Sequence, residues 1–158
     1  MKHVKLQEKQ CETLLPLALD LLSNSERYES ALPDGGVVRF EYASIIKHDC
    51  FIRPLKELAA KYKLNLMHPR LSRYNKGDLI DPHVDTIPDV VWAGVWLLQS
   101  EEPRLVIEYD NDVILLPDLT DQILLFDPKL KHAVLPIKGE LSRIVVNFWL
   151  CSQELHLK

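Results

Sequence analysis

The sequence contains few cysteines and no cysteine pair at short spacing. Its three cysteines, Cys11, Cys50 and Cys151, are odd in number and far apart in a chain of 158 residues. This pattern argues against a disulfide framework and against a cysteine-based zinc site. We therefore expect buried free thiols and a reducing compartment.

Long apolar runs and an excess of positive charge are also missing. Residues 1–10 hold no apolar signal-peptide core, and no stretch approaches the roughly 20 apolar residues of a membrane-spanning helix. We therefore expect a soluble, cytoplasmic protein with no membrane partner. The formal net charge of −4 gives no overall positive field, so nucleic acid is a disfavoured partner. The oligomeric state stays open.

The chain is long enough for one well-buried core, since 47% of its residues are hydrophobic, and we expect a single domain over residues 1–158. Its first part predicts two helices, at Leu6–Leu22 with a kink at Pro16, and at Arg53–Tyr62. A polar loop is expected over Ser23–Gly36 and a strand over Val37–Tyr42.

From residue 64 the pattern changes to short strands separated by turns. The predicted strands are Leu64–Tyr74 with an interruption at Pro69, Ile80–Thr86, Val90–Leu98, Arg104–Tyr109, Asp112–Leu116, Gln122–Phe126, His132–Pro136 and Ser142–Cys151. This order predicts a mainly β (α+β) fold, a sandwich or jelly roll, with helical support over residues 1–63 and a β core over about 64–151.

A His-x-Asp triplet at His83 and Asp85 is the most informative local pattern. Alternate side chains of a strand point to one face, so the two could present adjacent metal ligands. Six histidines and 12 aspartates give about 0.5 such triplets by chance, so the triplet alone carries little weight. It gains weight from His132 and Arg143 downstream, because two imidazoles and one carboxylate are the ligand set of a mononuclear non-haem iron(II) site.

An arginine after the last ligand suits an anionic co-substrate, because a planar guanidinium binds a carboxylate through two hydrogen bonds. Lys138 is the alternative for this role, but it lies in a Lys-Gly turn that we expect to be solvated.

The motifs in this order resemble the 2-oxoglutarate- and iron(II)-dependent oxygenases, in their prolyl-4-hydroxylase-like branch. The resemblance spans about Leu71 to Trp149. It comprises Arg-Tyr-x-x-Gly-Asp, His-x-Asp, a hydrophobic strand, Leu-Leu-Phe before the distal histidine, Pro-Ile-x-Gly, and an arginine on a final Phe-Trp strand.

The resemblance implies a double-stranded β-helix in which His83, Asp85 and His132 bind iron(II). It implies that Arg143 pairs with the distal carboxylate of 2-oxoglutarate and that Tyr74 contacts this co-substrate. The reaction implied consumes O2, with ascorbate as a candidate reductant, and hydroxylates a C–H bond. The substrate implied is a prolyl residue of a peptide or protein, or a small amino-acid-like molecule.

The chain departs from the family pattern at two places. Glu101-Glu102-Pro103-Arg104 replaces a Gly-Gly pair at the rim of the pocket, and Trp96-Leu97-Leu98 stands where prolyl hydroxylases can have a tyrosine. Two alternatives are a non-catalytic jelly-roll module that binds a metal or ligand, and a cupin-like metalloenzyme without 2-oxoglutarate, which would leave Arg143 unexplained.

The remaining aromatic and titratable residues have simpler explanations. We expect Trp92, Trp96 and Trp149 to lie in the core or in the wall of a pocket, with at most one of them in contact with substrate. Asp118 and Asp121 are expected in turns. Four further histidines have no partner at a ligand spacing and are expected to be solvated or singly hydrogen-bonded: His3, His48, His68 and His156.

Overall fold

The computed structural model describes residues 1–5, 8–120 and 122–152, and their side chains except those of residues 5 and 8–13. Two helices, α1 (Glu8–Leu22) and α2 (Asp49–Lys61), accompany a sheet of short strands. The strands are β1 (Lys2–Lys5), β2 (Glu26–Ala31), β3 (Val37–Ser44), β4 (Asn65–Tyr74), β5 (Leu79–His83), β6 (Val90–Gln99), β7 (Leu105–Tyr109), β8 (Asp112–Leu115), β9 (Gln122–Phe126), β10 (His132–Val134) and β11 (Arg143–Cys151).

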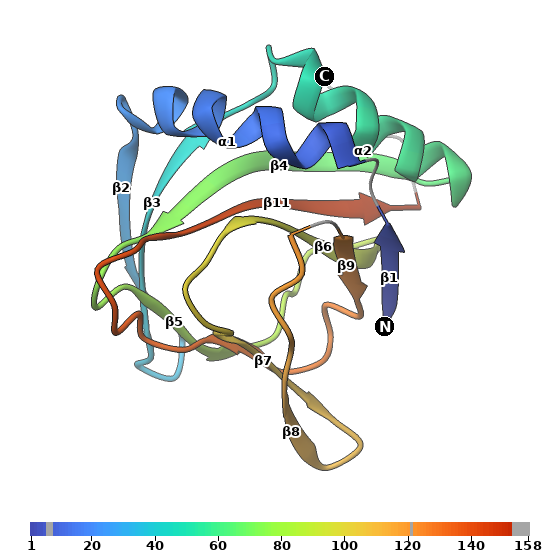
Figure 1. Ribbon diagram of the computed structural model, residues 1–158. Coiled ribbons are helices and arrows are strands. Elements are labelled where there is room, and N and C mark those ends of the chain that lie inside the picture. Colours follow the sequence, from blue (N-terminus) through green and yellow to red (C-terminus); the bar gives the residue numbers. More distant parts are fainter. Residues whose placement is uncertain (6–7, 121, 153–158) are drawn as a thin grey trace.

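The strands form one antiparallel sheet in the order β1-β9-β6-β11-β4-β3-β5-β10-β7-β8, with β2 paired to β3. The sheet curls so that β5, β7 and β10 lie opposite β4 and β11 (Figure 1). This is the jelly roll that the strand pattern predicts, and the two helices cover its outer face. No helix among the described residues is long and apolar enough to span a membrane.

The largest cluster of buried hydrophobic residues lies between the helices and the outer face of the sheet. Strand β11 shows why, because its alternate residues Ile144, Val146, Phe148 and Leu150 pack with both helices in one buried cluster. Gly94 of β6 is required beside Phe148, since a Cβ atom there would lie 2.1 Å from the buried ring. The opposite residues of β11 face the inside of the curl, where the candidate site lies.

All eight strands predicted after residue 64 are present, with ends that differ by a few residues. Strand β4 runs through Pro69 without a break, because the ladder with β11 is irregular between Asn147 and Trp149, opposite His68 and Pro69. A bulge accommodates proline, which has no N–H to donate to the ladder, and His68 takes a positive φ of 48° there.

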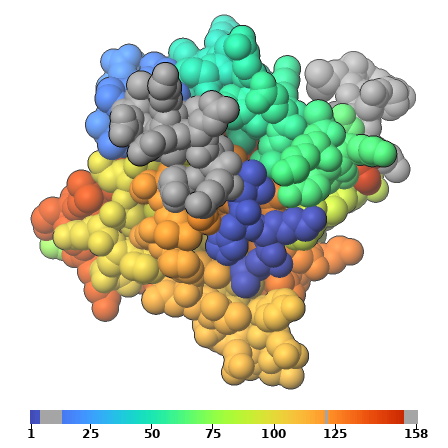
Figure 2. Space-filling model, turned by 45° about the vertical axis from the view of Figure 1, so that its right-hand side comes forward, coloured from blue at the N-terminus to red at the C-terminus, as the bar shows by residue number. Residues whose placement is uncertain are grey.

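A turn at Asp110-Asn111, between the strands predicted at Arg104–Tyr109 and Asp112–Leu116, closes the β7–β8 hairpin. Both residues have positive φ, 51° and 66°, as expected for the tight hairpin turns that match the twist of the strands. The hairpin projects from the body of the molecule, at the lower edge of the view in Figure 2.

Several expectations for the first part of the chain are wrong. The predicted loop Ser23–Gly36 contains strand β2, which escapes a pattern search because all six of its residues are exposed and no apolar alternation exists. Strand β1 was not predicted either; it pairs with β9 (Figures 1 and 2). Residues 1–63 therefore add strands to the sheet as well as helices.

Helix α2 begins at Asp49, four residues before the predicted start. Phe51 and Ile52 are buried in the helix-side core, and Asp49 pairs with Arg53 across one turn at 2.6 Å. Cys50, on the outer side of this turn, is exposed, which contradicts the expectation of a buried thiol. Cys151 is buried, and the side chain of Cys11 lies outside the described residues.

Candidate metal centre

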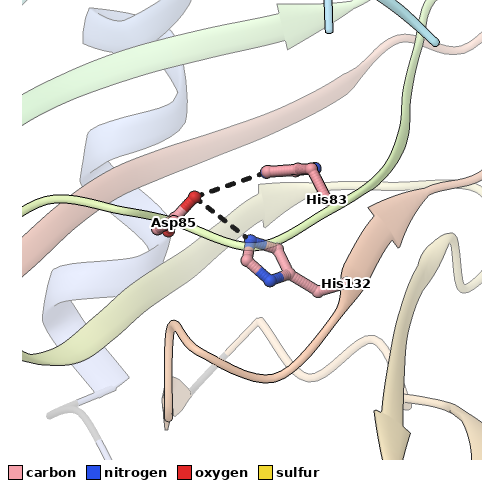
Figure 3. Close-up of side chains that lie close together, drawn as sticks. All are labelled: His83, Asp85 and His132. Carbon is pink, nitrogen blue, oxygen red and sulfur yellow. Dashed lines mark ion pairs between the residues drawn. The ribbon is translucent and has the colours of Figure 1, made fainter. Parts of the chain in front are cut away.

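His83 and His132 come from neighbouring strands of the curled sheet. His83 ends β5, His132 begins β10, and the two residues are direct cross-strand partners. Their rings lie 4.3 Å apart between centroids. Figure 3 shows Asp85 completing the group from the segment just after β5.

The position of Asp85 corrects one expectation. Strand β5 ends at His83, so strand alternation does not place the carboxylate. Instead, the backbone N–H of Asp85 donates a hydrogen bond of 2.9 Å to the carbonyl oxygen of Pro128, in the segment that leads to β10. The two halves of the cluster are therefore tied together through the backbone.

The hydrogen bonds of the two imidazoles define which nitrogen faces the centre. Nδ1 of His83 lies 2.9 Å from the carbonyl oxygen of Asp81, and Nδ1 of His132 lies 2.8 Å from that of Leu130. Since a carbonyl oxygen only accepts, each Nδ1 donates a proton, and in the neutral form of the imidazole Nε2 keeps the lone pair. This is the tautomer that metal-binding histidines use when their other nitrogen is held by a carbonyl group.

The carboxylate of Asp85 has two different surroundings. Its Oδ1 lies 3.4 Å from Nε2 of His83 and 3.6 Å from Nε2 of His132, while its Oδ2 accepts a 3.0 Å hydrogen bond from Nε1 of Trp149. Burial alone would raise the pKa of Asp85, but the nearby imidazoles of His132 and His83 and the hydrogen bond from Trp149 lower it well below its ordinary value. The group is therefore a carboxylate at neutral pH.

The donor set fits a metal ion. One ligand atom from each of the three residues can be chosen so that all lie within 4.8 Å of one another. Two imidazole nitrogens and one carboxylate oxygen on one side of a cavity match the facial arrangement of non-haem iron(II) sites. The cavity has a volume of about 280 Å³ and a largely apolar lining from the inner faces of β3, β5, β6, β10 and β11.

Arg143 and Tyr74 line the same cavity and are cross-strand partners on β11 and β4. Both are buried, and burial, with a smaller opposing effect of Arg70 and Arg143, raises the pKa of Tyr74 to about 12. Its hydroxyl is therefore neutral at physiological pH. Lys138, the alternative to Arg143, is exposed and does not line this cavity.

Arg143 already has a partner within the chain. Its Nη1 donates to Oδ1 of Asp118 at 2.8 Å and to Oγ of Ser100 at 3.3 Å. Asp118 lies in an irregular segment and not in the expected turn. Its side chain is only 15% exposed, and its Oδ2 has no hydrogen-bond partner among the described residues. Asp121 lies outside the described residues.

Sequence reasoning missed the contacts made by Trp149 and Asp118. Counting alternate positions along β11 from Arg143 would have placed Asn147 and Trp149 on the cavity face. No comparable signal existed for Asp118, because its segment has neither helical nor strand periodicity. Trp96 is fully buried among the helices, and Trp92 packs against the same cluster, as predicted for core residues.

The structure does not bring the other histidines to the centre. His3 and His68 are exposed, and His48 precedes α2, where its side chain makes no capping bond. His156 lies outside the described residues. The cluster of possible metal ligands found among residues 1–5, 8–120 and 122–152 is the predicted one.

The sequence matches no protein-family model and no curated protein. Its fold, by contrast, has many solved counterparts. A prolyl hydroxylase from Trichoplax adhaerens, solved with a peptide fragment of the oxygen degradation domain of hypoxia inducible factor, aligns at a TM-score of 0.74 and 16% identity, over 96% of this chain and 83% of that one.

An oxidoreductase of the 2OG-Fe(II) oxygenase family from Burkholderia pseudomallei aligns at a TM-score of 0.70 and 12% identity, over 96% of this chain and 86% of that one. The non-haem alpha-ketoglutarate-dependent epimerase SnoN from nogalamycin biosynthesis aligns at a TM-score of 0.75 and 14% identity, over 94% of this chain and 76% of that one. The chain therefore has the double-stranded β-helix fold of the 2-oxoglutarate- and iron(II)-dependent oxygenases, as the motifs implied.

Proposed function

We propose that this protein is a 2-oxoglutarate- and iron(II)-dependent dioxygenase that hydroxylates a C–H bond. The observation that carries the proposal is the convergence of His83, Asp85 and His132, each with a free ligand atom, inside a fold shared with such oxygenases. Iron(II), when bound, would supply the activation of O2 that is coupled to decarboxylation of 2-oxoglutarate into succinate and CO2. Ascorbate is the candidate reductant, and a reducing cytoplasm would suit the metal.

The three ligands would be held by their surroundings before a metal arrives. The carbonyl groups of Asp81 and Leu130 fix the two imidazoles, and Trp149 fixes Asp85. Burial alone would lower the pKa of His83, but Asp85 and the Asp81 carbonyl raise it overall. Metal binding would therefore compete with protonation of this imidazole.

Arg143 and Tyr74 would bind the distal carboxylate of 2-oxoglutarate. Arg143 uses Nη1 for Asp118 and Ser100, which leaves its other donors for a ligand. The neutral hydroxyl of Tyr74 can donate a hydrogen bond to the same carboxylate. Since both groups are buried beside apolar walls, these bonds would form away from competing water.

The substrate would be a prolyl residue of a peptide or protein, or a small amino-acid-like molecule. The solved counterparts span both kinds, since one was solved with a peptide and another belongs to nogalamycin biosynthesis. The fold does not select between them, because function depends on the site and not on the fold.

Turnover of 2-oxoglutarate tests the proposal. Purified protein with iron(II), ascorbate and O2 should form succinate slowly even without a prime substrate, and His132→Ala should abolish this. Arg143→Met should raise the KM for 2-oxoglutarate roughly tenfold or more, because the distal carboxylate loses its charged partner. It should also abolish the preference for 2-oxoglutarate over 2-oxobutyrate, which lacks that carboxylate.

Lys138→Met is the matched control, since it removes an exposed cation from a nearby turn. It should leave the KM and the preference unchanged. Absence of succinate from folded, iron-replete protein given a broad pool of peptides and metabolites would favour the non-catalytic binding module. Metal-dependent oxidation without 2-oxoglutarate would favour the cupin-like enzyme.

A further inference from the structure

Arg70 of β4 lines the same cavity as the candidate metal ligands and lacks a charged partner. It makes no ion pair or hydrogen bond with any described residue, and its Nε is buried without a hydrogen-bond partner. The other half-buried or buried arginines of the described chain each contact a carboxylate: Arg73 with Glu41, Arg104 with Glu102 and Arg143 with Asp118. Arg70 is therefore the exception that needs a partner from outside.

The aromatic rings beside Arg70 hold its guanidinium in place. The guanidinium carbon lies 5.0 Å from the ring centroid of Phe40 and 5.9 Å from that of Tyr42. A guanidinium over a ring face keeps its N–H groups, which lie in its own plane, available to an anion. A partly desolvated cation without hydrogen bonds is costly, and a bound carboxylate would remove that cost.

Asn147 stands beside Arg70 as its cross-strand partner on β11. Its side chain lines the cavity, and its Oδ1 is buried with no hydrogen-bond partner among the described residues. An amide offers both donors and an acceptor, so it can bind the same ligand as the guanidinium. Two adjacent polar side chains with unused hydrogen-bonding groups thus face one cavity.

Arg70 and Arg143 lie at different places along the cavity wall. The Arg70–Asn147 pair is four residues along both strands from the Tyr74–Arg143 pair, which corresponds to roughly 13 Å at about 3.3 Å per residue. Trp149, which holds Asp85, lies beyond Asn147 on the side away from Arg143. One ligand carboxylate is therefore not expected to reach both arginines.

Arg70 also borders a second, more open groove, between β4 and α2, to which Trp149 contributes as well. The basic residues that line it are Lys56, His68 and Arg70, and no carboxylate contributes among the described residues. A cationic and apolar lining contrasts with the net charge of −4 for the whole chain. An anion arriving from solvent would meet Arg70 at the junction of the groove and the cavity.

We propose that Arg70 and Asn147 bind a carboxylate of the prime substrate, so that the molecule oxidised beside the metal is an anion. The proposal rests on the function proposed above, in which Arg143 serves 2-oxoglutarate. The carboxylate belongs either to a small free acid or to an acidic residue of a peptide, and the chemistry of recognition is the same.

Binding of matched acid and amide probes tests this proposal. Protein loaded with manganese(II) and saturated with 2-oxoglutarate is titrated with benzoate and benzamide, with N-acetylproline and N-acetylprolinamide, and with acetyl-Pro-Glu-amide and acetyl-Pro-Gln-amide. Relaxation of the probe protons by the paramagnetic metal reports binding inside the cavity. We expect at least one acid to bind roughly tenfold or more tightly than its amide.

Arg70→Met should remove this preference, Arg70→Lys should keep part of it because the charge stays but the planar fork is lost, and Asn147→Ala should reduce it. Arg39→Met, an exposed arginine on β3, is the control for net charge and should behave as the unmodified protein. A preference in the second probe pair indicates a small acid, and one in the third pair an acidic peptide. Far-UV circular dichroism checks that each variant folds.

The proposal is overturned if no acid is preferred, or if Arg70→Met keeps the preference. It is also overturned if Arg70→Met instead removes the discrimination between 2-oxoglutarate and 2-oxobutyrate, since Arg70 would then serve the co-substrate. Calorimetry of 2-oxoglutarate binding on the same samples is a separate measurement. If 2-oxoglutarate does not bind, the proposed function fails, while the probe titrations without it still test Arg70.

Discussion

The two oxygens of Asp85 have different partners. One of them is held by Trp149, through the N–H of its indole ring. Oδ1 faces the two imidazoles and Oδ2 accepts the Nε1–H of Trp149 at 3.0 Å. A carboxylate held in this way presents one oxygen to a metal and cannot rotate freely. Mutation of a group that orients a metal ligand typically weakens metal affinity by about tenfold to a hundredfold.

We therefore expect Trp149→Phe to weaken metal binding about tenfold to a hundredfold, because the ring remains while the hydrogen bond to Asp85 is lost. Titration with manganese(II) followed by calorimetry measures the affinity. Trp92→Phe, in the helix-side core, is the control and should change thermal stability more than metal affinity. Equal affinities for Trp149→Phe and the unmodified protein would show that Asp85 needs no such support.

Asp118 places a carboxylate on the arginine that we assign to 2-oxoglutarate. Its Oδ1 accepts from Nη1 of Arg143, while its Oδ2 is buried without a hydrogen-bond partner among the described residues. A second carboxylate brought to Arg143 would be repelled by the first. Under the proposed function, Asp118 would compete with 2-oxoglutarate by charge and by occupying a donor of Arg143.

Asp118→Asn should therefore tighten 2-oxoglutarate binding several-fold, since the amide keeps the shape and removes the charge. Calorimetry with the metal-loaded protein measures the dissociation constant. Asp112→Asn, an exposed aspartate on the hairpin, should have no effect. Weaker binding in Asp118→Asn would mean that this carboxylate orients Arg143 and does not compete.

Between elements, Glu41 joins β3 to β4 and to the turns beside them. It accepts hydrogen bonds from Nε of Arg73 at 2.9 Å, Oγ of Ser25 at 3.1 Å and Nδ2 of Asn75 at 2.9 Å. Burial would raise the pKa of Glu41, but Arg73 and Ser25 lower it overall. A carboxyl with a lowered pKa in the folded state stabilises the fold above the pKa of the unfolded chain.

Glu41→Gln should consequently lower the free energy of unfolding at pH 7 by about 1–3 kcal/mol, the usual value for hydrogen bonds to a charged group. The difference should shrink as the pH falls below about 4.5, the ordinary pKa of glutamate, and continue to shrink through the lower pKa of the folded state. Urea unfolding at several pH values measures it. Glu57→Gln, exposed on α2, should show no such dependence; a constant difference for Glu41→Gln would contradict the assignment.

The success of prediction differs between elements for physical reasons. The eight later strands were predictable because their inner and outer residues alternate, or because turns such as Asp110-Asn111 bound them. Strand β2 was not predictable, because backbone hydrogen bonds pair it with β3 and these backbone groups are the same whatever the sequence. The start of α2 was missed because burial of Phe51 and Ile52 outweighs their weak helix propensity.

At the scale of the whole molecule, the sequence predicted which site residues come together but not how they are held. The spacing of His83, Asp85 and His132, taken with the surrounding motifs and the family they resemble, led us to expect a cluster. The hydrogen bonds that fix them come from Asp81, Leu130, Pro128 and Trp149, and three of these four use backbone carbonyl groups. Backbone contacts leave no residue signature, so only the fold could show them.

The place of β11 in the sheet bears on how the chain can be synthesised. This strand lies between β4 and β6 and supplies Arg143, Asn147 and Trp149 to the cavity wall, yet it follows every other described strand in the sequence. Until residues 143–151 leave the ribosome, β4 and β6 each carry an open edge able to pair with a wrong strand. The sheet can therefore be completed only at the end of translation of this region, and until then the two open edges favour mispairing and aggregation.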